Sequence, residues 1–171
     1  MSPPRLRVTM VFERRLSDSP GGTSMDIPPR VLLSKPKEKH LTAPQLEFLT
    51  QVHARLVKAG LELVGVDSVS RLQDQAVEMR MLQGAFVIAF SQWVGERSVR
   101  KRETVVMPTE FNHLTIALAA AARRPLIVLR EGSVDERGGL RPALGTRLVR
   151  VPSGLDPSWL DTPDFIKHFN Y

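Results

Sequence analysis

The sequence contains no cysteine among its 171 residues. This excludes disulfide bonds, thiolate metal sites, a cysteine nucleophile and iron–sulfur clusters. A chain of this length can bury a full hydrophobic core as a single domain, so it needs neither disulfides nor a metal for stability. The lack of cysteine fits a reducing compartment, and we expect a cytoplasmic location.

Long apolar runs are also missing. The longest, at residues 84–90 and 125–129, have the length of strands and are far shorter than the ~20 residues that span a bilayer. Residues 1–30 lack the continuous apolar region of a signal peptide. The sequence therefore predicts no contact with a membrane, and an N-terminal arm (residues 1–30) followed by a single α/β domain (residues 31–171).

Several motifs that would identify a reaction are absent. The chain has neither a P-loop nor the GxGxxG dinucleotide fingerprint, and it has no GxSxG nucleophile elbow. No HExxH or other paired histidines occur at metal-binding spacing. We therefore expect no metal site, no resident cofactor and no serine-hydrolase chemistry.

Apolar runs of strand length alternate with segments of helical periodicity after residue 30. Such alternation implies right-handed crossovers and a parallel sheet that is covered on both faces. The sequence therefore predicts an open, mainly parallel five-stranded α/β sheet of the flavodoxin-like or Rossmann-like kind, with residues 6–12 as a candidate edge strand. Strands are expected at 31–34, 61–66, 84–90, 125–129 and 146–151, helices at 44–59, 68–82 and 108–121, and a helix or loop at 157–169.

Two helices carry apolar residues at a spacing that predicts a buried face. Residues 91–107 interrupt the alternation as a long polar loop, and loops of this length are typically functional or disordered. The predicted buried faces are Leu46, Leu49, Val52, Leu56 and Val57 in the first helix, and Phe111, Leu114, Leu118 and Ala121 in the third.

The chain is basic, with 24 lysines and arginines against 18 acidic residues and a formal net charge of +6 at pH 7. Such an excess attracts anions such as nucleotides or nucleic acid, although many basic domains simply have a solvated positive surface. In open parallel sheets, ligands bind at the carboxyl ends of the strands where the strand order reverses. The expected site therefore combines the loops after Ser34 and after residue 90 with the helix start at Glu110.

Basic and aromatic side chains in these loops suit a nucleotide. Ser34, Lys35 and Lys37 follow the first strand and could bind a phosphate, with a solvated turn as the alternative. Trp93 could stack on a base while Arg97 meets a phosphate. The alternative for this tryptophan is an anchor of a hydrophobic lid.

Glu110 is the candidate catalytic residue. It lies in the predicted first turn of a helix, where the helix dipole favours a carboxylate without any function. It could also serve as a nucleophile or general base, or stabilise the positive charge that develops on a sugar when an N-glycosidic bond is cleaved. His113, one turn further on, could face the same cleft.

Four segments resemble a known superfamily in their order and spacing: VLLS at 31–34, MLQGAFVIA at 81–89, TEFNH at 109–113 with Ala117, and RPLIVL at 124–129. They are similar to the superfamily that joins TIR-like domains with nucleoside 2-deoxyribosyltransferases and related nucleotide N-glycosidases. The resemblance implies that Glu110 acts on the ribose of a nucleoside, nucleotide or NAD, while Ser34 and Trp93 hold the base. Residues 106–109, Val-Met-Pro-Thr, depart from the Asp-x-Gly-Thr element of the deoxyribosyltransferases.

Three functional hypotheses follow. The first is an enzyme that cleaves or transfers at the N-glycosidic bond of a nucleoside or nucleotide. The alternative is a non-catalytic TIR-like module that senses nucleotides or binds another protein chain, a second copy of itself included. The third is nucleic-acid binding through the basic residues 97–102, which the sequence favours least.

Overall fold

Five parallel strands form the central sheet of the molecule. The computed structural model describes residues 27–65, 72–96, 104–141 and 147–168. Within them the strand order is β2-β1-β3-β6-β7, and every neighbouring pair is parallel. This confirms the predicted open, five-stranded α/β fold. The strands are β1 (Arg30–Ser34), β2 (Glu62–Gly65), β3 (Gly84–Ala89), β6 (Leu126–Glu131) and β7 (Arg147–Val151).

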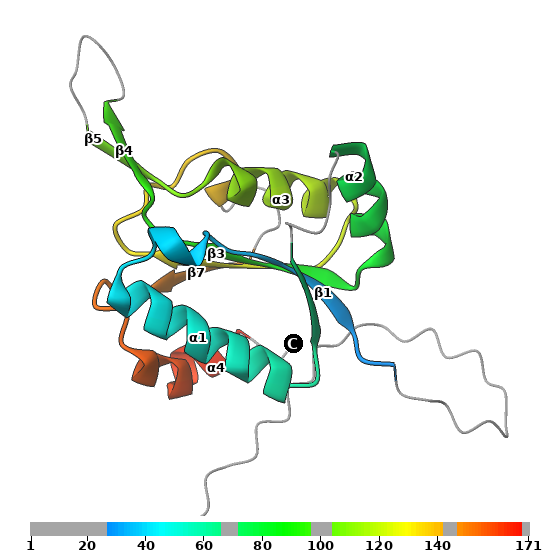
Figure 1. Cartoon of the computed structure of the whole chain (residues 1–171), viewed down its shortest axis with the longest axis horizontal. Helices are drawn as coiled ribbons and strands as arrows, with labels where there is room; N and C mark the ends of the chain where they lie inside the picture. Colours follow the sequence, from blue (N-terminus) through cyan, green and yellow to red (C-terminus); the bar gives the residue numbers. More distant parts are fainter. Residues whose placement is uncertain (1–26, 66–71, 97–103, 142–146, 169–171) are drawn as a thin grey trace, which may run out of the picture.

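Helices cover both faces of this sheet (Figure 1). Helices α1 and α4 lie on one face, and α2 and α3 lie on the other. Strand β3 in the middle is buried at all six positions, as expected for a parallel strand covered on both sides. The helices are α1 (Ala43–Lys58), α2 (Leu72–Met81), α3 (Glu110–Ala121) and α4 (Pro163–Ile166), with short 3-10 helices η1 (Glu38–His40), η3 (Gly138–Leu140) and η5 (Pro157–Asp161).

Side chains alternate along the strands between two hydrophobic cores. Phe86 and Ile88 of β3, with Phe90 just after the strand, belong to the core under α1. Ala85 and Val87 of the same strand belong to the core under α2 and α3. Because side chains on this second face are smaller, α3 can lie close to β3, against which it packs most extensively.

Helix α1 begins and ends where the sequence predicts. The amide of Thr42 donates to Gln45 Oε1 at 3.0 Å, and Thr42 Oγ1 accepts from the amide of Gln45 at 3.5 Å. This capping box satisfies donors that a helix start leaves free. Gly60 follows the helix with a φ of +83°, a left-handed conformation that glycine adopts without strain.

The predicted buried face of α1 is only partly correct. Leu46 and Val57 are 40% and 51% exposed, so neither belongs to the core. Gln45 and Phe48 are buried in addition. The polar Gln45 can face inward because its side-chain amide is hydrogen-bonded at both its oxygen and its nitrogen. The buried residues of α1 are Gln45, Phe48, Leu49, Val52 and Leu56.

The predicted buried face of α3 is only partly correct, since of its four residues Leu118 packs against the core under α2 and α3. Phe111 and Ala121 are exposed, and Leu114 and Leu118 are half-buried. Nearly every side of this helix is apolar, so spacing alone does not select a face. A buried hydrogen bond from Asn112 selects it instead. The buried residues of α3 are Asn112, Thr115, Ile116 and Ala119.

The predicted loop at residues 91–107 contains a β-hairpin. Strands β4 (Trp93–Glu96) and β5 (Thr104–Met107) pair antiparallel, with Trp93 opposite Met107. Asp135, after β6, secures the hairpin: its carboxylate accepts from the amide of Val106 at 2.8 Å, and its own amide donates to the Val106 carbonyl at 2.9 Å. The charged residues around the turn obscured the β-branched run of β5, so sequence reasoning missed this element.

Two predictions concern the ends of the chain. The candidate edge strand at residues 6–12 lies outside the described residues. The predicted helix or loop at 157–169 forms η5 and α4, which pack beneath α1. Among the described residues, no helix has the length and apolar character needed to cross a membrane.

The strand order places a reversal point between β1 and β3. From β1 the chain crosses to β2 on one side, and then returns to β3 on the other. This is the flavodoxin-like order, in which ligands bind outside the carboxyl ends of the two strands that flank the reversal. The fold therefore places a candidate site after Ser34 of β1 and before Ser91, which follows β3.

Candidate functional site

A buried series of side-chain hydrogen bonds joins β1 to the first turn of α3. Asn112 Nδ2 donates to Ser34 Oγ at 3.1 Å, and Thr109 Oγ1 donates to Asn112 Oδ1 at 3.0 Å. Ser34 and Asn112 are both buried. The bonds hold the start of α3 over the carboxyl end of β1, so Ser34 supports the site from beneath and does not present its hydroxyl to solvent.

A second set of hydrogen bonds links three elements at the same edge of the sheet. Glu131, the last residue of β6, accepts a hydrogen bond from the amide of Ser91 at 2.9 Å and from Gln45 Nε2 at 3.0 Å, both at Oε2. These bonds link β6 to the end of β3 and to the first turn of α1. Sequence reasoning missed Asn112, Gln45 and Glu131. Their one shared signal was a polar residue at the end of a strand or in the first turn of a helix.

Glu110 is exposed at the first position of α3. It lies two residues before Asn112, which corresponds to about 200° around the helix, so the two side chains leave α3 on opposite sides. Helical side chains tilt toward the helix N-terminus, and that end of α3 lies at the carboxyl edge of the sheet. The Glu110 carboxylate therefore projects into solvent beyond this edge.

The basic loop after β1 is open to solvent. Lys35 Nζ forms an ion pair with Glu38 at 2.9 Å, and this contact lowers the pKa of the Glu38 carboxyl through the hydrogen bond and the lysine charge. Lys37 is exposed and begins the turn into η1. An exposed ion pair of this kind contributes little to stability, so the Lys35 ammonium group can turn from Glu38 toward an anion at little cost. The exposed Lys37 side chain can do the same.

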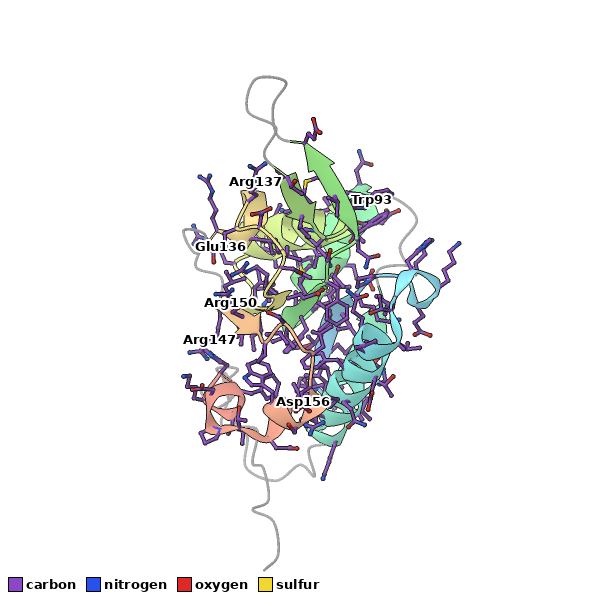
Figure 2. All side chains as sticks on the ribbon, turned by 90° about the vertical axis from the view of Figure 1, so that its left-hand side faces the viewer. Trp93, Glu136, Arg137, Arg147, Arg150 and Asp156 are labelled. Atoms are coloured by element: carbon purple, nitrogen blue, oxygen red, sulfur yellow. The ribbon has the colours of Figure 1, made fainter. Side chains whose placement is uncertain are left out.

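Trp93 is 59% exposed on β4. Figure 2 shows it on the opposite side of the hairpin from Glu136 and Arg137. An indole exposed to this extent offers a face on which a planar ring could stack. Arg97, the predicted phosphate contact, lies outside the described residues, as do the other basic residues of 97–102.

His113 lies against η3 and takes no part in the hydrogen bonds that join Thr109, Asn112 and Ser34. A Cβ built on Gly138 would lie 3.3 Å from His113 Nδ1, so the imidazole packs directly under this glycine. Nδ1 is buried and has no hydrogen-bond partner among the described residues. Burial lowers the pKa of His113, because the site does not solvate an imidazolium. The structure therefore gives His113 a packing contact with the 138–140 turn.

We expect His113 to make stability depend on pH. Its pKa is lower in the folded protein than the value of about 6.5 in the unfolded chain. The unfolded state then binds more protons, so the free energy of unfolding falls as the pH drops below about 6.5 and levels off below the folded pKa. Urea unfolding at pH 7.5 and pH 5.5 should show this loss, and His113→Gln should reduce it.

Two comparisons make this prediction specific. Burial also lowers the pKa of His168, with Arg147 and Lys167 adding to the effect, so part of the pH dependence remains in His113→Gln. His53→Gln makes the same substitution at an exposed position of α1 and leaves His113 and His168 in place, so it is the matched control. An unchanged difference in His113→Gln would show that the imidazole is solvated in the folded state.

Within the described residues, we assign no ligand site to the buried Arg130 or to the cavity between α2 and α3. Arg130, buried at the end of β6, donates from Nη1 to the carbonyl of Val134 and pairs through Nη2 with Glu136 at 2.7 Å, while its buried Nε has no hydrogen-bond partner among the described residues. A cavity of about 10 Å³, between α2 and α3 and partly lined by Met79 and Thr115, holds about one water molecule. Within the described ranges no group of three or more His, Asp or Glu side chains could hold a metal ion, and the absence of a metal stays a prediction.

Comparison with protein-family models, with curated proteins and with solved structures gave no match for this chain. What the site can do therefore follows from its own residues.

Proposed function

We propose that this domain binds a nucleoside, nucleotide or NAD at the carboxyl ends of β1 and β3, and cleaves or transfers its N-glycosidic bond. The observation that carries the proposal is the hydrogen bond from Asn112 to Ser34, 3.1 Å long and buried at the reversal point of the sheet. A buried polar contact at this place holds the start of α3 in one position. The same edge then combines carboxylates, lysines and an exposed indole.

Each of these groups has a role in the proposed reaction. An exposed carboxylate at Glu110 would stabilise the positive charge that develops on the ribose, or form a bond to it, as the base leaves. Trp93 would stack on the base. Lys35 and Lys37 would pair with the phosphates of a nucleotide, for which an ammonium group serves as a point charge.

The test is release of a free base by the purified full chain. Nucleosides, nucleotides and NAD are incubated with the protein, and the products are separated by chromatography. We expect one of these compounds to lose its base, which for NAD means nicotinamide. If none does, at high protein concentration and in any assembled form that gel filtration detects, catalysis is ruled out and the first hypothesis should be dropped.

One observation favours a second function, binding without cleavage. Glu110 leaves α3 on the side opposite the buried face, so no described contact orients its carboxylate. A module that only senses nucleotides would need the polar edge but no oriented catalyst. It would show a rise in the free energy of unfolding of ~2.7 kcal/mol at a ligand concentration one hundred times the Kd, with no base released.

A further inference from the structure

Glu131 holds a carboxylate at the candidate site with one oxygen engaged and the other free. Both of its hydrogen bonds, from Ser91 N and Gln45 Nε2, end on Oε2. In the described part of the chain Oε1 has no hydrogen-bond partner, and it is not among the buried unpaired atoms there. The free oxygen is therefore accessible, while the position of the group is fixed from β3 and α1.

The charge of Glu131 is not neutralised by a neighbour. Other acidic residues near the strands have a cation, such as Arg30 for Glu62 and Arg130 for Glu136. No lysine, arginine or histidine nitrogen of the described residues lies within 4.0 Å of Glu131. A half-buried carboxylate is costly unless donors surround it, and its two donors here are both neutral. The group is thus equipped to accept further hydrogen bonds.

The position of Glu131 relates it to the proposed ligand. It ends β6, the strand next to β3, and its bond to Ser91 places it at the carboxyl end of β3. That end is one side of the reversal point, where this class of sheet binds its ligands. An ionised carboxylate accepts hydrogen bonds and donates none, so a hydroxyl group matches it better than a carbonyl or a phosphate.

We infer that the free oxygen of Glu131 accepts a hydrogen bond from the 2′-hydroxyl group of the bound nucleotide, and that Glu131 thereby selects ribonucleotides over 2′-deoxyribonucleotides. The inference rests on the proposed function and specifies the sugar that the same site takes. Hydrogen bonds to an ionised acceptor are roughly twice as strong as neutral ones, so loss of the 2′-hydroxyl has a measurable effect.

The test compares two sugars on the same base. Calorimetry gives the Kd of the full chain for the four ribonucleoside monophosphates and their 2′-deoxy counterparts. We expect at least one ribonucleotide to bind about tenfold tighter than its deoxy form, which corresponds to ~1.4 kcal/mol. Glu131→Gln should bring this ratio close to one by weakening binding of the ribonucleotide, because Ser91 and Gln45 would hold the amide oxygen and leave the NH2 group, which cannot accept a hydrogen bond, facing the sugar. The Kd of the deoxynucleotide should stay the same.

Two further variants separate recognition from support. Gln45→Ala removes one donor to Glu131 but leaves the carboxylate, so the ratio should fall less than in Glu131→Gln, and the Kd of the deoxynucleotide should stay the same. Glu47→Gln neutralises an exposed glutamate of α1 and should change neither. If Glu131→Gln does not fold by circular dichroism, Glu131→Asp is measured in its place and should lower the ratio, since the shorter side chain cannot reach both Ser91 and a sugar.

The outcomes distinguish this inference from the proposed function. Binding of nucleotides with no preference for ribose, or an equal loss of both sugars in Glu131→Gln, shows that Glu131 only supports the Ser91 segment and overturns the inference while nucleotide binding stands. No binding of any mononucleotide or of NAD by the wild type overturns the proposed function itself.

Discussion

Glu110→Gln is expected to bind its nucleotide as tightly as the wild type and to release its base about 10²- to 10⁴-fold more slowly. The substitution keeps the size of an exposed side chain at the first position of α3, so neither the fold nor the hydrogen bond from Asn112 to Ser34 should change. What it removes is the negative charge that the proposed reaction needs opposite the ribose. The measurement is the rate of base release by chromatography, together with the Kd by calorimetry.

Two variants serve as references for this result. Glu47→Gln, an exposed glutamate of α1, should retain the wild-type rate. Glu131→Gln should act mainly on the choice of sugar. An unchanged rate in Glu110→Gln would remove Glu110 from the reaction, and loss of release in Glu131→Gln alone would transfer the catalytic role to the carboxylate that Ser91 and Gln45 hold in place.

Phe48→Ala should lower the free energy of unfolding by ~3–5 kcal/mol. Phe48 is fully buried on α1, and its ring lies 6.2 Å from that of Phe90 and 6.4 Å from that of Trp159. Truncation to alanine removes apolar contacts with the sheet and with η5 at once and leaves a cavity among aromatic rings. Urea unfolding monitored by circular dichroism gives the difference.

Phe111→Ala is the matched control for this substitution. The same number of atoms is removed, but Phe111 is 47% exposed on α3, so the cost should be ~1 kcal/mol or less. Equal losses at the two positions would contradict the exposure of Phe111 and would support the buried face predicted from residue spacing.

The main elements of the sheet could be read from residue order. The run at residues 84–90 is apolar throughout, which only a strand covered on both faces requires, and β3 has this burial. Thr42, Pro44 and Gly60 mark the two ends of α1 by local chemistry, because capping depends on neighbouring residues alone. Alternation of such elements was enough to predict a parallel sheet.

The faces of the helices could not be read in the same way. In α3, apolar residues surround the helix, so no spacing rule distinguishes Phe111 from Ile116. The decision comes from Asn112, which is polar and would be placed outside by any hydropathy rule, yet it is buried because Ser34 lies opposite. Similarly, Gln45 enters the core because Glu131 accepts its hydrogen bond.

For the candidate site, the order of residues alone predicted a position at the carboxyl edge of the sheet, with basic and aromatic residues around it. Strand ends and helix starts are local properties, so Ser34, Trp93 and Glu110 could be named in advance. The burial of Ser34 under Asn112 and the hydrogen bonds of Glu131 with Ser91 and Gln45 depend on long-range packing. Those partners are separated by 40 to 86 positions in the chain, and nothing in local sequence encodes which distant donor will satisfy a buried acceptor.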